Sequence, residues 1–202
     1  MDRLSKLFMV ALIVMFLIAG VVCISGSEKS SSGYEVTWVG TPPAENVMIE
    51  TKIKQQISPY PGMEYDSVTL SASRENEKLR IHAIAESSGS RYPDLYDFTY
   101  RDGDLIQIGY LLEAIPESVR SEAIGVAMQS EGVAKALSTD MNAYGVSSVK
   151  RILPETSENF YSRKTLISVT WLDHSVSALV DMDTREVVQV WNGQVVQERN
   201  GQ

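Results

Sequence analysis

The feature that most constrains this chain is an unbroken apolar run near its N-terminus. Residues 7–24 contain no charged or strongly polar side chain; Arg3 and Lys6 precede them and Glu28 follows. A run of about 18 residues, rising 1.5 Å per residue as a helix, just spans a hydrocarbon core of about 30 Å. Basic residues before the run favour a cytoplasmic N-terminus. We therefore expect the remainder of the chain to lie outside the cytoplasm, held at the cell membrane by residues 7–24.

The sequence leaves three modes of attachment open. Residues 1–24 fit a retained single-pass anchor, because the run is uniformly apolar. They also fit a cleavable signal peptide, with a basic start and small residues at 25–27, which would give a secreted protein. A lipoprotein would carry its lipid on Cys23, but Val22 stands where the usual motif has a small residue. Otherwise Cys23 is an ordinary apolar residue of the membrane segment.

Composition excludes several classes of function. Cys23 is the only cysteine, so disulfides, cysteine zinc sites and thiol catalysis are excluded from the exported part. The whole chain has a net charge of −8, and without Asp2, Arg3 and Lys6 it keeps 25 acidic and 16 basic residues, a net charge of −9. An acidic surface repels phosphate backbones, so we expect no nucleic-acid partner.

Residues 25–33 form a Ser- and Gly-rich spacer, and residues 34–113 then form a first predicted α+β unit. Thr41 is the predicted N-cap of a helix with Ile49, Ile53 and Ile57 along one face. Asp102 and Gly103 predict a tight hairpin turn. The predicted strands of this unit cover residues 34–39, 67–73, 78–86, 96–100 and 105–111.

Residues 114–202 repeat this order as a second predicted α+β unit. A helix opens at Pro116, bends at residues 130–132 and continues to Leu137. The closing hairpins of the two units, residues 96–106 and 178–188, match in hydrophobic phase and turn position. The predicted strands of this unit cover residues 146–153, 165–172, 176–182 and 187–191. The fold class is therefore α+β, with antiparallel sheet packed by helices, either as two tandem units or as one continuous sheet.

The second unit resembles the PepSY-type domain, a small α+β module of exported and membrane-tethered proteins. The resemblance covers residues 117–192 and rests on the segments 122–127, 130–133, 136–137, 169–171 and 178–188. The family usually has Gly where this chain has Arg185, so either the turn differs or Arg185 is strained. The resemblance implies PepSY-like or cystatin-like units without catalytic residues, which bind or restrain peptidases and other partners.

Candidate catalytic and metal-binding residues are scattered. His82 lies on the polar face of a predicted strand and His174 in a predicted turn, each without a second His or Cys nearby. A carboxylate cluster at Asp181, Asp183 and Glu186 lacks the spacing of a calcium loop. Asp102 and Asp104 occupy the corresponding earlier turn, where aspartate is an ordinary turn residue. We assign no catalytic, cofactor-binding or metal-binding residues. Trp38, Trp171 and Trp191 lie in predicted strands, where they either pack in the core or line a groove that binds a peptide.

We therefore expect a membrane-tethered, extracytoplasmic module that binds a protein or peptide, with peptidase modulation as the activity that the resemblance implies. An open sheet edge beside a helix would accept a partner strand. The alternative is a small-ligand carrier or enzyme whose site is assembled from scattered residues. A deep pocket holding His82 or His174 beside two carboxylates would favour that alternative. A structural envelope component without a specific ligand is the third possibility.

Overall fold

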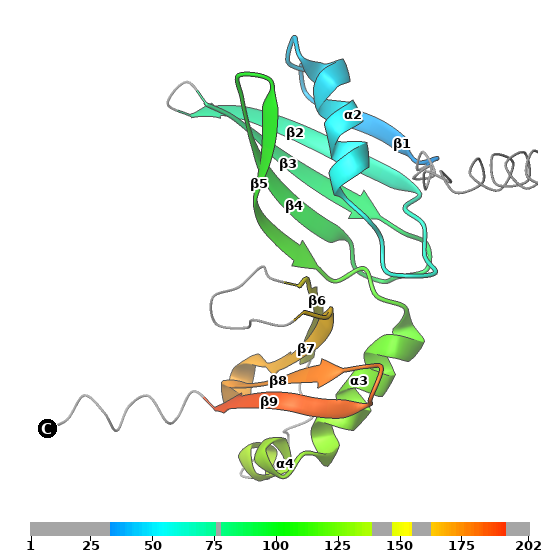
Figure 1. Ribbon diagram of the computed structural model, residues 1–202, viewed down its shortest axis with the longest axis vertical. Helices are drawn as coiled ribbons and strands as arrows, with labels where there is room; N and C mark the ends of the chain where they lie inside the picture. Colours follow the sequence, from blue (N-terminus) through cyan, green and yellow to red (C-terminus); the bar gives the residue numbers. More distant parts are fainter. Residues whose placement is uncertain (1–32, 76–77, 139–146, 155–162, 193–202) are drawn as a thin grey trace, which may run out of the picture. The chain divides into compact units, whose positions relative to one another are not determined.

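The computed structural model describes residues 33–75, 78–138, 147–154 and 163–192. These residues form a mixed sheet of nine strands in chain order, with helices in α+β arrangement (Figure 1). The elements are β1 (Glu35–Val39), α2 (Asn46–Gln56), β2 (Ser67–Glu75), β3 (Lys78–Glu86), β4 (Asp94–Arg101), β5 (Asp104–Leu112), α3 (Glu117–Gln129), α4 (Glu131–Leu137), β6 (Ser147–Ile152), β7 (Leu166–Trp171), a 3-10 turn (Leu172–His174), β8 (Val176–Asp181) and β9 (Glu186–Asn192). The α+β class is thereby confirmed.

The expected membrane segment, residues 1–24, and Cys23 within it lie outside the described residues, as does the spacer up to residue 32. Within the part of the chain that the structure describes, no helix is both long enough and apolar enough to cross a membrane.

Helix α2 begins later than the sequence predicts. Thr41 is not its N-cap: Glu45 takes that position, without a side-chain capping bond, and a turn precedes it in which the Asn46 amide donates to the Pro43 carbonyl. Proline disfavours helical backbone in the residue before it, so two consecutive prolines delay the helix. The predicted apolar face is confirmed, because Ile49, Ile53 and Ile57 are all buried.

The strands follow the predicted alternation. In β3, Leu79, Ile81, Ala83 and Ala85 are buried and the residues between them are not. Strand β2 extends past the predicted end at residue 73 to pair antiparallel with β3 along its whole length. Strand β1 pairs with β2 in parallel, since the connection between them contains α2 and brings the chain back to the same end.

Both closing hairpins turn through left-handed backbone. Asp102 and Gly103 have φ of 53° and 88°, which confirms the tight turn. Arg185 has φ of 57°, so it adopts the conformation for which the resemblance expects Gly. Each hairpin also has an irregularity in its strand pairing. The register shifts between Asp97 and Phe98 in the first hairpin and between Leu179 and Val180 in the second. The two shifts fall at the same position when the hairpins are aligned by hydrophobic phase.

Helices α3 and α4 confirm the predicted bend. Pro116 precedes α3, and Glu117 lies in its first turn, near the positive end of the helix dipole. Ser130 has extended backbone and separates the two helices. Ala123 and Ala127 are fully buried against the strands of the second half.

The buried apolar residues form two clusters, and two neighbouring residues of the chain belong to different clusters. Ala114 belongs to the first cluster and Ile115 to the second, and both are fully buried. We call residues 33–114 the first half and residues 115–192 the second half. Among the described residues, β5 and β6 share one backbone pair, Leu112 with Arg151. The sheet is therefore continuous in strand order but narrow where the halves meet.

Gly103 and Gly125 differ in backbone conformation, so replacing each with alanine should change the unfolding free energy in opposite directions. Replacing Gly103 with Ala places a Cβ at φ 88° and should lower the unfolding free energy by about 1–2 kcal/mol. Replacing Gly125 with Ala, inside α3 where no atom lies within 4 Å of the added Cβ, should raise it by about 0.5–1 kcal/mol. Urea unfolding measures both values, and effects of the same sign would contradict these backbone assignments.

Candidate functional site

A buried polar cluster lies where the two halves meet. Asp94, the first residue of β4, is fully buried, and its Oδ1 accepts a hydrogen bond of 2.7 Å from the Ala114 amide. Its Oδ2 accepts from the Tyr65 hydroxyl at 2.6 Å and from Arg151 Nη2 at 3.2 Å. The Tyr96 hydroxyl lies 2.8 Å from that of Tyr65. We call Tyr65, Asp94, Tyr96 and Arg151 the junction cluster.

Arg151 connects β6 with the first half. Its side chain is 4% exposed, and Nη1 and Nη2 donate to the carbonyls of Pro59 and Ser58, each at 2.8 Å. A planar guanidinium with several fixed donors can satisfy two carbonyls and a carboxylate together, which a lysine ammonium does less well. A buried charge without such partners would be strongly destabilising. The cluster therefore fixes Arg151 to both the loop after α2 and the start of β4.

Burial keeps the tyrosines of this cluster protonated. Burial raises the pKa of Tyr65 far above its ordinary value of 10.0, and the neighbouring Tyr96 and Asp94 add to that shift. Burial, with the Asp94 charge, raises the pKa of Tyr96 to about 12. Burial also raises the pKa of Asp94, against the hydrogen bonds from Tyr65 and Ala114 and the charge of Arg151. Each of the four side chains is buried, so the cluster acts as an internal tie and not as a group that meets a ligand.

The outer side of β5 has little strand pairing in the described structure. Residues 104–111 pair with β4 on one side, and only Leu112 pairs with β6 on the other. The Leu105 carbonyl accepts a hydrogen bond of 3.0 Å from the Gln56 side chain. Ile106 and Ile108 are 57% and 50% exposed, and Ile108 is the extra residue of the bulge. We call residues 104–111 the β5 edge.

Helix α2 lies beside this edge. Lys52 Nζ lies 3.8 Å from Asp104 Oδ1, and the Tyr100 hydroxyl donates to Met48 Sδ at 3.1 Å. The opposite flank of the helix is tied to β1, because Trp38 Nε1 donates to Glu50 at 2.6 Å. A hollow of about 520 Å³ runs along the β5-side flank, lined by Ala44, Glu45, Val47, Met48, Thr51, Lys52 and Gln55. We call this flank the α2 hollow.

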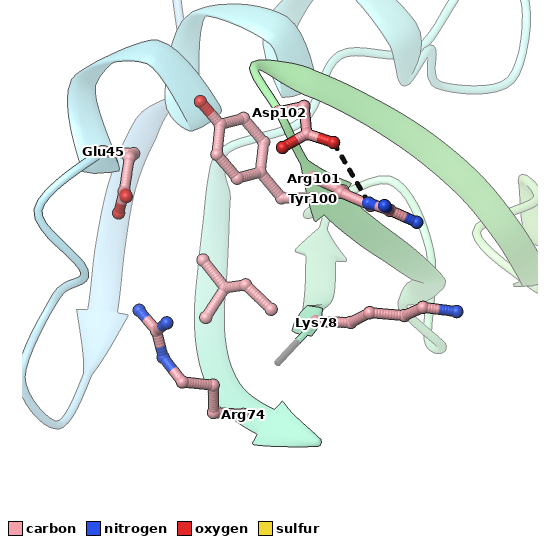
Figure 2. A pocket seen from close by; sticks show the side chains of 7 residues that line it. Glu45, Arg74, Lys78, Tyr100, Arg101 and Asp102 are labelled. Carbon is pink, nitrogen blue, oxygen red and sulfur yellow. Dashed lines mark hydrogen bonds and ion pairs between the residues drawn. The ribbon is translucent and has the colours of Figure 1, made fainter. Parts of the chain in front are cut away.

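A second hollow, of about 390 Å³, lies at the tips of the hairpins (Figure 2). It contains charges of both signs: Figure 2 shows Arg74 reaching toward Glu45, with Lys78 and Arg101 extending away from them. Arg101 Nε lies 3.0 Å from Asp102 Oδ2. Because its charges are mixed and Arg101, one of its two arginines, is already paired, this hollow does not select one ligand charge. It shares Glu45 with the α2 hollow.

The structure separates the residues that the sequence singled out. His82 Nδ1 lies 2.8 Å from Asp97 Oδ1 on an exposed sheet face, while His174 lies in the 3-10 turn. In the described segments no group of three or more His, Cys, Asp or Glu side chains comes together to hold a metal ion. His82 thus has one carboxylate beside it, and it lines neither of the two hollows described above.

Two carboxylates of the predicted cluster, Asp181 and Asp183, form ion pairs with Lys164. Lys164 Nζ lies 3.1 Å from Asp181 and 3.7 Å from Asp183. The hydrogen bond from Lys164 lowers the pKa of Asp181. Glu186 begins β9, paired in register with Asp181. These contacts explain the aspartates as parts of a turn.

The three tryptophans differ in exposure. Trp171 is buried in the second cluster. Trp38 and Trp191 are half-buried, with Trp38 packed against the first cluster. They are spread over β1, β7 and β9, so they do not form one peptide groove.

Sequence reasoning missed the junction cluster, although one signal was present. Val149, Arg151 and Leu153 share one phase of a predicted strand, and Val149 is fully buried. A charged residue in the core phase indicates a buried ion pair. The identity of its partner depends on the pairing of Leu112 with Arg151, which no local pattern shows.

Comparisons with family models, with curated proteins and with solved structures found no match to this chain.

The buried ion pair predicts that replacing Arg151 lowers the unfolding free energy much more than replacing Arg185, a surface arginine. Arg151→Met leaves Asp94 buried without its counter-ion and should lower the unfolding free energy by about 3–5 kcal/mol. Arg185→Met, which removes an exposed pair with Glu122, is the matched control and should cost less than about 1 kcal/mol. Chemical denaturation compares them; equal losses would contradict the assigned role of Arg151.

The raised pKa of Tyr96 predicts alkaline destabilisation. Because the folded protein holds this proton up to about pH 12 and the unfolded chain releases it near 10, the stabilisation is complete below pH 10 and is lost as pH rises toward 12. Tyr96→Phe should therefore reduce the slope of unfolding free energy against pH in this window, by up to about 1.4 kcal/mol per pH unit. Tyr92→Phe, at a half-buried tyrosine outside the cluster, is the control; a slope unchanged by Tyr96→Phe would refute the prediction.

Proposed function

We propose that this protein is a membrane-tethered, extracytoplasmic module that binds an extended segment of a protein or peptide by strand addition at the β5 edge. The observation that carries the proposal is the lack of a strand partner on the outer side of residues 106–109 in the described structure, beside exposed isoleucines. Unpaired amide and carbonyl groups along a strand are a template for another strand.

The β5 edge differs from the strands at the two ends of the described sheet, β1 and β9. Strand β1 has five residues, begins with Glu35 and is paired in parallel with β2. Strand β9 is longer, but Val188 is its one large apolar side chain that is exposed. The β5 edge has two exposed isoleucines and borders the α2 hollow, where side chains of an added strand would find an apolar surface at Val47 and Met48. Main-chain pairing would supply affinity and the hollow would supply selectivity.

The architecture supports a finer proposal of two tandem PepSY-like or cystatin-like units. Each half contains a helical segment followed by four antiparallel strands, and the closing hairpins have their irregular steps at aligned positions. Each half also has its own buried cluster. Peptidase modulation is the activity that such units would perform here, with an extended peptidase segment or propeptide as the bound strand.

The proposed location follows from the apolar N-terminal run. Residues 7–24 would hold the module at the membrane, and the spacer before residue 34 would let the β5 edge reach partners near the membrane surface.

A peptide-binding assay tests the site. The probe is a fluorescent synthetic peptide of about six residues that alternates Thr and Val. Ile108→Lys on the β5 edge should weaken its binding by about tenfold or more, because a lysine on an edge opposes strand pairing. Val39→Lys and Val188→Lys, at similarly exposed residues of β1 and β9, are the controls and should leave binding unchanged. Loss of binding in a control variant but not in Ile108→Lys would place the site elsewhere.

A further inference from the structure

The connection between the halves is short and has little backbone pairing. Ala114 and Ile115 bury their side chains in different clusters, although they are neighbours in the chain. Residue 115 is thus the first of the second core. The single pair between Leu112 and Arg151 is the sheet contact that crosses this point in the described structure.

Two buried arginines of the second half hold this connection. Arg151 donates to the carbonyls of Ser58 and Pro59 and pairs with Asp94. Arg120, in α3, donates from Nη2 to the Glu113 carbonyl at 2.8 Å. Its guanidinium also lies 4.6 Å from the centre of the Tyr92 ring. Both arginines are at most 6% exposed, so both are enclosed at the junction.

Other contacts across the junction are polar: the Ile115 amide donates to Ser90 Oγ at 3.2 Å, and the Leu153 amide donates to the Tyr110 hydroxyl at 3.4 Å. Ser148 Oγ donates to Glu113 Oε1 at 2.7 Å. Tyr60 of the first half packs against the second cluster, and Leu153 of the second half packs against the first, both only partly buried. Interfaces between domains that move relative to each other are typically smaller and more polar than permanent ones.

We propose that the two halves are separate rigid bodies that open about residues 114–115, with Arg151 and Arg120 as the lock that holds them closed. This inference stands independently of peptide binding. Opening would break one backbone pair and the contacts of Tyr60 and Leu153, and would leave the fully buried residues of both clusters in place.

The chemistry of the lock favours reversible opening. When the junction opens, Asp94, Arg151 and Arg120 become hydrated, and their hydration offsets the loss of their contacts. An apolar junction of the same size would gain nothing from water. Replacing one arginine with methionine removes the charged part of the lock and keeps an unbranched aliphatic side chain in its place.

Distances between two spin labels test this proposal in the full chain. Labels are attached at Ser73→Cys in β2 and Gln189→Cys in β9, both exposed positions, with Cys23→Ser so that no other thiol is present. The unaltered junction should give one narrow distance distribution. Arg151→Met and Arg120→Met should each broaden it or add a longer distance. Arg185→Met, a surface arginine of the second half, should leave it narrow.

Hydrogen exchange of the same variants separates opening from unfolding. The proposal expects the amides of β3 and of β7, one strand from each half, to exchange far more slowly than those of an unfolded chain while the distance distribution broadens. A narrow distribution in both arginine variants would overturn the proposal. So would complete loss of protection in β3 and β7 together, because that result would show one cooperative body instead of two.

Discussion

The contact between Asp94 and Arg151 is the interaction on which the relation of the two halves depends. Neither ion is stable alone inside the protein, since a buried charge without partners is strongly destabilising. Together they draw in the Tyr65 hydroxyl, the Ala114 amide and the carbonyls of Ser58 and Pro59. The loop after α2, the start of β4, the end of β5 and strand β6 are thus held by one polar network. The first apolar cluster covers the loop, β4 and β5, whereas Val149 of β6 belongs to the second.

The same junction explains why β5 has little strand pairing on its outer side in the described structure. Among the described residues, β5 pairs with β6 only near the end of each strand, where the side chain of Arg151 enters the junction cluster. Residues 106–109 therefore have no strand partner on that side, and exposed isoleucines and a helix flank lie beside them. Soluble proteins usually protect such edges with charges, bulges or covering segments. Here a bulge at Ile108 and the Gln56 side chain act on parts of the edge, and the proposed partner strand would occupy the remainder.

Local patterns in the sequence predicted most of the elements but not their tertiary partners. The four-residue spacing of Ile49, Ile53 and Ile57 predicted the buried face of α2, and Asp102 with Gly103 predicted the hairpin turn, because both depend on backbone geometry within one element. The start of α2 was wrong by several residues, since the effect of consecutive prolines outweighed the capping preference of Thr41. The partnership of Asp94 with Arg151 was not predictable, because it joins residues far apart in the chain through strand order. The β5 edge was expected only in general terms, as an open edge beside a helix.

Amide hydrogen exchange of the full chain, with and without the alternating Thr-Val peptide, tests whether the β5 edge accepts an added strand. Bound peptide should slow exchange at amides of residues 104–111, while amides of β1 and β9 exchange as before. Unchanged exchange along β5 at a peptide concentration that saturates binding, or new protection in β1 or β9 instead, would show that β5 does not accept the strand.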